Sequence, residues 1–282
     1  MDSNVHDVTA QTQGSLPAHA EQEEHVIEIS HLKKTFENLE VLKDISIDVA
    51  QGENLAVLGK SGAGKSVLIK CIVGLLEPDE GTILLFGEDI STVGKKELAE
   101  LRKRVGFLFQ SAALYDSMSV RENLEFPLRR VKPKPSAEEK ESMIREALGN
   151  VGLSDAIEKM PSELSGGMRK RLGLARTLIQ KPDIMLYDEP TTGLDPITSR
   201  EISNLILEVQ KTNNTSSIII THDIECTKIT SNRIVVINEG LCIAEGTFEE
   251  LERSTDEWVR SFFTWQNGAR GNGAGTQNEY ST

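Results

Sequence analysis

A glycine-rich segment that contains one key lysine has the residue types and spacing needed to bind phosphate. It reads GKSGAGKS and comprises Gly59, Lys60, Ser61, Gly62, Ala63, Gly64, Lys65 and Ser66. An apolar run, residues 54–58, precedes it, and an apolar helical pattern follows. Glycines let backbone N–H groups approach a phosphate, and a helix start adds partial positive charge. We expect Lys65 to contact the β- and γ-phosphates of a nucleotide and Ser66 to bind Mg²⁺. A glycine-rich turn that binds nothing is the alternative, which the strand-loop-helix context disfavours.

Two carboxylates follow a second apolar run. Asp188 and Glu189 come directly after residues 184–187, which predict a buried strand. In an open α/β sheet, ligands bind at the carboxyl ends of the strands. Asp188 therefore fits an outer-shell partner of Mg²⁺, and Glu189 fits a group that orients or deprotonates the attacking water. The alternative is an acidic pair on the surface without a ligand.

A third motif narrows the class of nucleotide-binding protein. The segment LSGGM, residues 164–168, precedes a basic helical pattern and lies 20 residues before Asp188. It resembles the LSGGQ signature of the ABC ATPases, with Met168 where that family commonly has Gln. Ser165 is predicted to cap the helix, and Gly166 and Gly167 leave space for a phosphate at its start. The resemblance implies that this phosphate belongs to ATP held by a second subunit.

The other motifs of that family occur in the expected order. Gln110 resembles the glutamine that senses Mg²⁺ and leads into the helical subdomain. Asp195, after Leu194, resembles the residue at the seam between subunits. His222 resembles the switch histidine that contacts the γ-phosphate. Phe36 lies where the family places an aromatic residue that stacks on adenine, although a core phenylalanine is the alternative.

Further segments resemble the ATPases of Mla/MCE phospholipid-transport systems. They are FLFQSAALY at 107–115, SVREN at 119–123 and GGMRKR at 166–171. In that group, the segment after the glutamine receives a short helix of a membrane permease. We therefore expect permease subunits to dock near residues 111–128, with Tyr115 and Met118 as the best contact candidates. The alternative is that this segment only packs the helical subdomain.

Alternating strand-like and helix-like patterns must position these motifs, and they predict an α/β fold. The resemblance implies the P-loop NTPase core of the ABC ATPase type, with an antiparallel β subdomain and an inserted helical subdomain. A hairpin is expected to turn at residues 238–240, and Ser136 with Glu139 predicts the capping box of a helix. The strand candidates are 26–36, 41–50, 53–58, 82–87, 105–109, 183–188, 216–221 and 233–245.

The same patterns divide the chain into segments. We expect flexible tails at both ends and a C-terminal helix whose apolar face packs on this chain or on a second subunit. The segments are a tail at 1–25, a first stretch of the ATPase core at 26–93, a helical subdomain at 94–165, a second stretch of the core at 166–250, a helix at 251–265 and a tail at 266–282.

Composition limits the function classes. The 282 residues carry 31 basic and 44 acidic side chains, a net charge of −13, which disfavours a nucleic-acid partner. The sequence shows neither an apolar stretch near 18 residues nor a signal-peptide pattern, and its three cysteines lack metal-like spacing. We therefore expect a cytoplasmic protein, and the resemblance implies that a permease holds it at the inner face of the cell membrane.

These observations lead to one functional hypothesis. The chain is expected to form a homodimer with ATP and Mg²⁺ sandwiched head to tail between two copies, and hydrolysis powers phospholipid transport. The first rival is the ATPase of another ABC transporter, for amino acids or lipoproteins. A DNA-maintenance ATPase is the second, but only about 100 residues separate the phosphate loop from the signature, without coiled-coil heptads. A non-catalytic binding module is the third.

Overall fold

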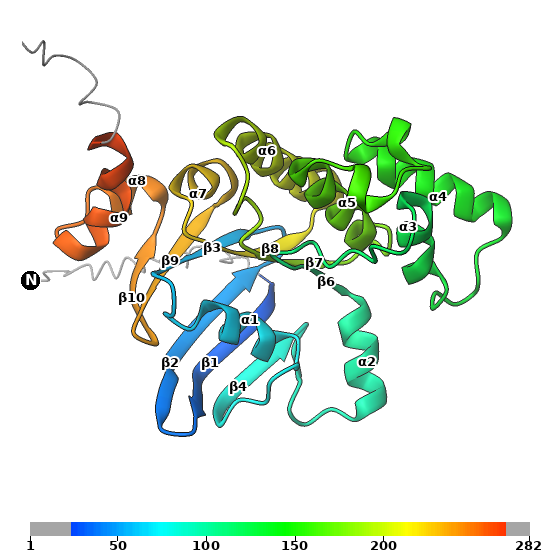
Figure 1. Cartoon of the computed structure of the whole chain (residues 1–282). Helices are drawn as coiled ribbons and strands as arrows, with labels where there is room; N and C mark the ends of the chain where they lie inside the picture. The colour runs from blue at the N-terminus through cyan, green and yellow to red at the C-terminus, as the bar shows by residue number, and fades with distance from the viewer. Residues whose placement is uncertain (1–23, 269–282) are drawn as a thin grey trace, which may run out of the picture.

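A ten-stranded sheet organises the region of the chain that the computed structural model describes, residues 24–268 (Figure 1). Its strand order is β5-β4-β1-β2-β10-β9-β3-β8-β7-β6. The strands are β1 His25–Phe36, β2 Leu39–Ala50, β3 Asn54–Leu58, β4 Glu80–Leu85, β5 Glu88–Asp89, β6 Val105–Leu108, β7 Ile184–Asp188, β8 Ser216–Thr221, β9 Arg233–Asn238 and β10 Leu241–Gly246. All strands expected from the sequence are present, with ends shifted by at most two residues.

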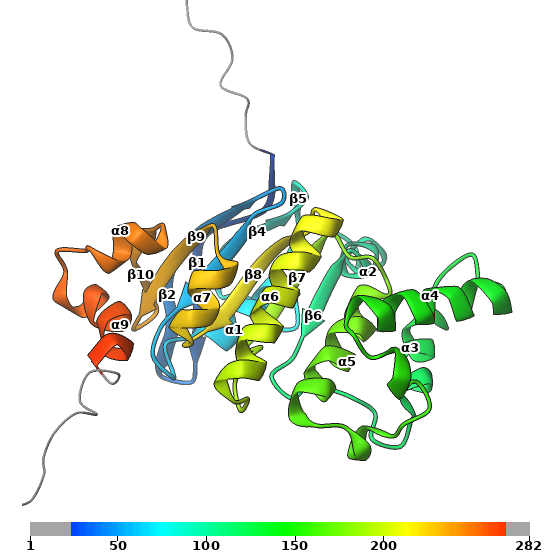
Figure 2. The ribbon, with the colours of Figure 1, turned by 90° about the horizontal axis from the view of Figure 1, so that it is seen from above.

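Helices cover both faces of this sheet, so the predicted α/β fold is confirmed. Helices α1 and α2 lie on one side, and α5, α6 and α7 lie on the other (Figures 1 and 2). The helices are α1 Lys65–Ile72, α2 Lys95–Lys103, α3 Val120–Leu128, α4 Ala137–Asn150, α5 Gly166–Leu178, α6 Pro196–Asn213, α7 Ile224–Thr230, α8 Phe248–Glu252 and α9 Glu257–Gly268, with short 3₁₀ turns at Ser154–Ala156 and Pro161–Glu163.

One half of the sheet is parallel and deeply buried. Strands β6, β7, β8, β3 and β9 run in the same direction as neighbours. Every residue of β3 and of β8 is buried, which matches their continuous apolar runs. Parallel strands place their carboxyl ends at one edge of the sheet. The segments that follow β3, β6, β7 and β8 therefore meet there.

The other half is an antiparallel arm joined to the first through β10. Strands β9 and β10 form the hairpin predicted at residues 238–240, where Glu239 and Gly240 have φ values of 47° and 79°. A Cβ atom at Gly240 would lie 2.6 Å from the carbonyl oxygen of Val41, so this turn requires glycine.

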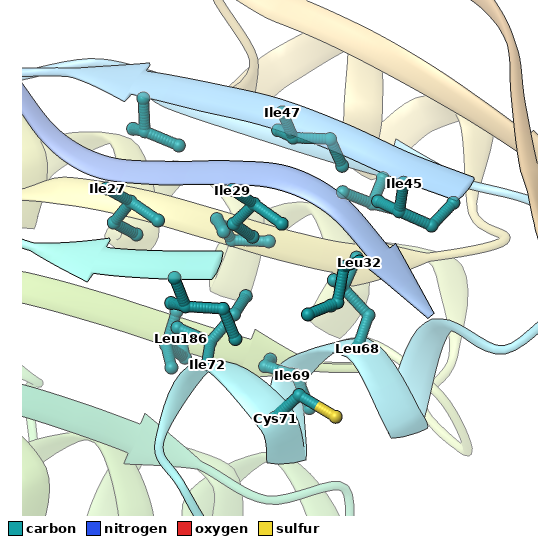
Figure 3. Close-up of a cluster of buried hydrophobic side chains, with 14 of the residues drawn as sticks. Ile27, Ile29, Leu32, Ile45, Ile47, Leu68, Ile69, Cys71, Ile72 and Leu186 are labelled. Carbon is teal, nitrogen blue, oxygen red and sulfur yellow. The ribbon is translucent and has the colours of Figure 1, made fainter. Parts of the chain in front are cut away.

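Helix α1 holds the two halves together through the core. Leu68, Ile69 and Ile72 point from α1 toward apolar side chains of β1 and β2, among them Leu32 and Ile45 (Figure 3). All five of these side chains are fully buried. The start of α1, which the phosphate loop precedes, is thereby fixed against both halves of the sheet.

The helical region differs from the expected one at its start. Leu101 of α2 and Phe107 of β6 belong to the same apolar cluster as α1, so α2 and β6 belong to the core. A second cluster joins α3, α4 and α5 and begins with Leu108. A helical pattern does not reveal which apolar cluster its helix packs on, and the boundary at residue 94 stays a prediction. The capping box of α4 is confirmed, since Ser136 accepts a hydrogen bond from the N–H of Glu139.

The ends of the described chain also correct the predicted limits. His25 begins β1 and α9 continues to Gly268, so both elements extend into segments expected to be tails. Residues 1–23 and 269–282, which carry the rest of that prediction, lie outside the described residues. Val259 and Phe263 of α9 are buried against Leu58 of β3, so the apolar face of this helix packs on its own chain. No helix within residues 24–268 is both long and apolar enough to cross a membrane.

Removal of the Phe263 ring tests this packing. Phe263 is 2% exposed and meets the ring of Phe248 edge-on at 5.2 Å between centroids. We expect Phe263→Ala to lower the free energy of unfolding in urea by about 3 kcal/mol, because the change leaves a cavity. Leu75→Ala, at a side chain that is 59% exposed, is the control and should cost less than about 0.5 kcal/mol. Equal effects of the two variants would mean that α9 lies outside the cooperative core.

Candidate functional site

The phosphate loop leaves β3 and enters α1 through two glycines in left-handed conformation. Gly62 has φ 84° and Gly64 has φ 97°. A Cβ atom at Gly64 would lie 2.7 Å from the Leu42 side chain and 2.8 Å from the carbonyl oxygen of Val41. Gly64 must therefore remain a glycine, and the loop winds tightly before the first N–H groups of α1.

Lys65 lies inside this loop with only 7% of its surface exposed. Its ammonium donates hydrogen bonds to the carbonyl oxygens of Gly59, at 2.6 Å, and Lys60, at 3.1 Å. Burial lowers the pKa of Lys65, while the nearby carboxylates of Glu189 and Asp188 oppose that shift. The loop thus presents a desolvated cation, which interacts strongly with phosphate oxygens.

Asp188 ends β7 close to the first turn of α1. Its Oδ1 lies 3.4 Å from the Ser66 hydroxyl, which donates toward it. Burial, followed by the charge of Glu189, raises the pKa of Asp188. Gln110 follows β6 and is exposed at the same edge of the sheet. Hydroxyl, carboxylate and amide oxygens are ligands that Mg²⁺ accepts, so this donor set fits the expected cation.

Glu189 and His222 form the next pair. The Nδ1 atom of His222 lies 2.8 Å from Oε2 of Glu189, and the Thr192 hydroxyl donates to that oxygen at 3.0 Å. Glu189 itself has φ 50°, the left-handed region that a residue with a side chain rarely adopts. Strained backbone of this kind is common at functional sites.

With the exception of Asp188, which lies behind Ser66, these groups line one cleft of about 560 Å³. It brings together residues from the phosphate loop, the Gln110 loop, the turn after β7 and the turn after β8. Its lining comprises Val41, Lys60, Ser61, Gly62, Gly64, Lys65, Ser66, Val67, Gln110, Glu189, Thr192 and His222. Two other loop residues, Gly59 and Ala63, are buried behind the surface of the loop. The sequence did not indicate Val41 or Thr192, whose side chains reach the cleft only through the tertiary fold.

Five further predicted site residues lie away from this cleft and from the loop around it. Ser165 caps α5 by accepting from the N–H of Met168 at 3.2 Å, which confirms the predicted cap, and Gly166 is exposed beside it. A Cβ atom at Gly167 would lie 2.4 Å from the Thr198 side chain, so that position requires glycine. The remaining two are Asp195 and Phe36.

Asp195 has a structural role that the sequence did not indicate. It caps α6, accepting hydrogen bonds from the N–H groups of Ile197 and Thr198 at 3.0 Å each. The hydroxyl of Thr198 also donates to it, and these bonds lower the pKa of Asp195. Phe36 ends β1 with 41% of its surface exposed and Lys34 5.6 Å above its ring. Adenine stacking by Phe36 stays a prediction.

Comparisons with known proteins agree with this geometry. The family model for ABC transporters matches residues 42–192. The "probable ribonucleotide transport ATP-binding protein mkl" of Mycobacterium leprae is 39% identical, covering 84% of this chain and 68% of the relative. The "intermembrane phospholipid transport system ATP-binding protein MlaF" of Haemophilus influenzae is also 39% identical, covering 85% and 90%. The "methionine import ATP-binding protein MetN" of Mesorhizobium japonicum is 35% identical, covering 85% and 66%. The chain thus spans about two thirds of the length of the first and third relatives.

Solved structures share the fold. The protein cbiO1 of Clostridium perfringens, which belongs to the ABC transporter complex cbiONQ, aligns with a TM-score of 0.77 at 29% identity, covering 88% of this chain and 96% of that one. A dimeric, post-hydrolysis structure of the ATP-binding cassette MJ0796 bound to ADP and Pi aligns with a TM-score of 0.72 at 28% identity, covering 79% and 98%. The predicted ABC ATPase fold is therefore confirmed.

The order of the motifs, the cleft that they line and these similarities all point to one family. The chain belongs to the ABC transporter family, as an ATP-binding subunit that hydrolyses ATP.

Proposed function

We propose that this subunit powers phospholipid transport between membranes through a separate membrane permease. The observation that carries the proposal is the similarity to MlaF, whose name states intermembrane phospholipid transport and of which the chain covers 90%. The Mla/MCE-like segments around Gln110 and after Ser165 support it. The similarity to a methionine importer supports one rival, the ATPase of an amino-acid transporter.

The cleft supports a division of roles in ATP hydrolysis. Lys65 would bind the β- and γ-phosphates, and Ser66, Asp188 and Gln110 would hold Mg²⁺, which offsets charge on the phosphate oxygens when bound. Glu189 orients or deprotonates the attacking water. His222, 2.8 Å from Glu189, contacts the γ-phosphate and keeps this geometry. The chemistry depends on placement and electrostatics, since loose phosphoryl transfer requires little covalent help.

A head-to-tail homodimer accounts for the residues outside the cleft. Ser165, Gly166 and Gly167 begin α5, where helix N–H groups can bind a phosphate. They lie outside the cleft of their own chain, which supports a role at the ATP held by the other copy. Asp195 caps α6 beside Gly167, at the proposed seam. The dimeric structure of the related cassette supports pairing of this kind.

The segment 111–128 is the proposed permease contact. Asn123 is fully buried and fixes its backbone, donating to the carbonyl oxygens of Tyr115 at 3.1 Å and Met118 at 2.9 Å. The Tyr115 ring is 38% exposed and lies 4.6 Å from the Phe126 ring, whereas Leu128 is 2% exposed and belongs to the core. A fixed loop with an exposed tyrosine backed by the half-buried Phe126 suits a short permease helix. Such docking would hold the subunit at the cytoplasmic face of the membrane.

Glu189→Gln should separate binding from chemistry. The amide keeps the shape of the side chain but cannot accept a proton, so ATP turnover should fall about 100-fold or more. ATP should still bind, and should now trap a dimer that size-exclusion chromatography detects. Glu208→Gln, at an exposed position of α6, is the matched control and should leave turnover unchanged. Normal hydrolysis by Glu189→Gln would remove the role proposed for this residue.

Mixed dimers test whether Lys65 and Ser165 act on one ATP from opposite chains. Homodimers of Lys65→Ala and of Ser165→Arg should both be inactive. A dimer with one chain of each contains one composite site with both native groups and one with neither. Some ATPase activity should therefore return on mixing, measured by phosphate release. No rescue, with mixed dimers verified by two affinity tags, would contradict the trans arrangement.

Capture of the native complex tests the transport proposal. The tagged chain, purified from detergent-solubilised membranes of its own host, should retain a permease, and phospholipid vesicles should raise its ATPase activity. Stimulation by methionine or another amino acid instead would favour the rival. Tyr115→Glu should abolish retention of the permease while the isolated subunit still binds ATP. Leu75→Glu, on a different exposed apolar side chain, should retain it; equal retention by both variants would place the contact elsewhere.

A further inference from the structure

Lys170 is a buried lysine to which the proposed ATP chemistry assigns no role. Within residues 24–268, only Lys65 and Lys170 are charged side chains that are buried, at 7% and 6% exposure. The Lys170 ammonium donates to the carbonyl oxygens of Gln110, at 2.5 Å, and Glu189, at 3.1 Å. A charge is costly to bury unless it is paired and hydrogen-bonded. Lys170 therefore joins the backbones of two cleft residues at a position where an apolar side chain would be less costly.

The Glu189 backbone needs such support. Its φ of 50° is unfavourable for a residue with a side chain. Its N–H donates to the carbonyl oxygen of Ile220 at 2.8 Å. Its own carbonyl accepts from Lys170 at 3.1 Å and, at the longer distance of 3.3 Å, from the N–H of Thr192. The N–H is thus held by β8, and the carbonyl by α5 together with the turn that follows β7. That arrangement directs the Glu189 carboxylate toward His222.

The loop that begins at Gln110 is held by the same face of α5. Ala112 and Ala113 have φ values of 61° and 46°, so this loop too is strained. A Cβ atom at Gly173 would lie 2.8 Å from Cβ of Ala112, which shows how closely α5 approaches. Arg176 donates to the carbonyl oxygen of Ala113. Residues 170, 173 and 176 recur every three positions and lie on one face of the helix.

We propose that Lys170 is a positioning residue for ATP hydrolysis, which holds the backbones of Gln110 and Glu189 in the geometry that the reaction needs. This inference rests on the roles proposed above for Gln110 and Glu189. Helix α5 begins at the Ser165 cap, which faces the other ATP in the proposed dimer. Through Lys170, the same helix also contacts the cleft of its own chain.

The chemistry predicts a specific kinetic signature for loss of Lys170. The phosphates are bound by Lys65 and the N–H groups of α1, which Lys170 does not contact, so ATP affinity should persist. The attacking water depends on Glu189, and an error of about 1 Å in the position of a catalytic group can lower a rate by about 100-fold. Turnover should therefore fall while binding does not.

Lys170→Met removes the charge and both hydrogen bonds at similar volume. We expect its turnover to fall about 10- to 100-fold, with the ATP dissociation constant changed less than about threefold. Lys170→Gln keeps a donor and should retain more turnover than Lys170→Met. Arg171→Met is the matched control, since Arg171 donates to the carbonyl oxygen of Val151 at 3.0 Å, outside the cleft. It should keep turnover within about threefold of the unaltered chain.

Four measurements decide the outcome: steady-state turnover, ATP affinity by titration, thermal unfolding, and dimer formation in the Glu189→Gln background. Normal turnover of Lys170→Met would overturn the proposal. Loss of folding or of ATP binding in both Lys170 variants would also overturn it, because Lys170 would then be a general core group. If Glu189→Gln alone hydrolyses ATP normally, the role proposed for Glu189 fails, which this design distinguishes from a failure of Lys170.

Discussion

The in-register pairing of parallel strands is the constraint on which the ATP cleft depends. Leu58 of β3 pairs with Thr221 of β8, and Asp188 of β7 pairs with Ile220 of that same strand. The phosphate loop, His222 and the acidic pair therefore emerge at one edge of the sheet. A slip of one residue would turn every side chain of a strand to its other face. Because β3 and β8 are wholly buried, packing of the core fixes this register. The register in turn fixes the relative positions of the cleft residues that follow these strands.

Charge balance is the second requirement of the cleft, and it arises from two lysines, Lys65 and Lys170, and two carboxylates, Asp188 and Glu189. Burial lowers the pKa of Lys65 and of Lys170, and it raises the pKa of Asp188. The carboxylates of Asp188 and Glu189 oppose the shift of both lysines, so the charge of each lysine is stabilised by the two carboxylates. A nucleotide adds negative charge to this set, which explains why oxygen donors for a cation lie beside the phosphate loop.

Much of this arrangement could be predicted because it is encoded locally. The strand and helix on either side of the glycine-rich loop, the Ser165 cap and the hairpin at 238–240 depend on residues close in sequence, and the structure bears them out. What could not be predicted depends on packing between distant segments. Nothing in the basic pattern after the signature marks Lys170 as buried, and it is buried because α5 packs against the loop that begins at Gln110. The sequence pattern assigns α2 to the helical region, although Leu101 packs on the core.

Helix α5 gives the proposed transport cycle a physical connection between its components. Ser165 caps its start, Lys170 reaches the backbone of Glu189, and Arg176 holds the loop after Gln110. The Arg176 guanidinium also lies 5.1 Å from the centre of the Tyr115 ring, in the segment proposed to meet the permease. A helix is stiff along its axis, so a displacement of α5 at one of these contacts also moves the residues of α5 at the others. Coupling between ATP and permease then requires no long pathway, since a single helix contacts the nucleotide cleft, the proposed dimer seam and the proposed permease surface.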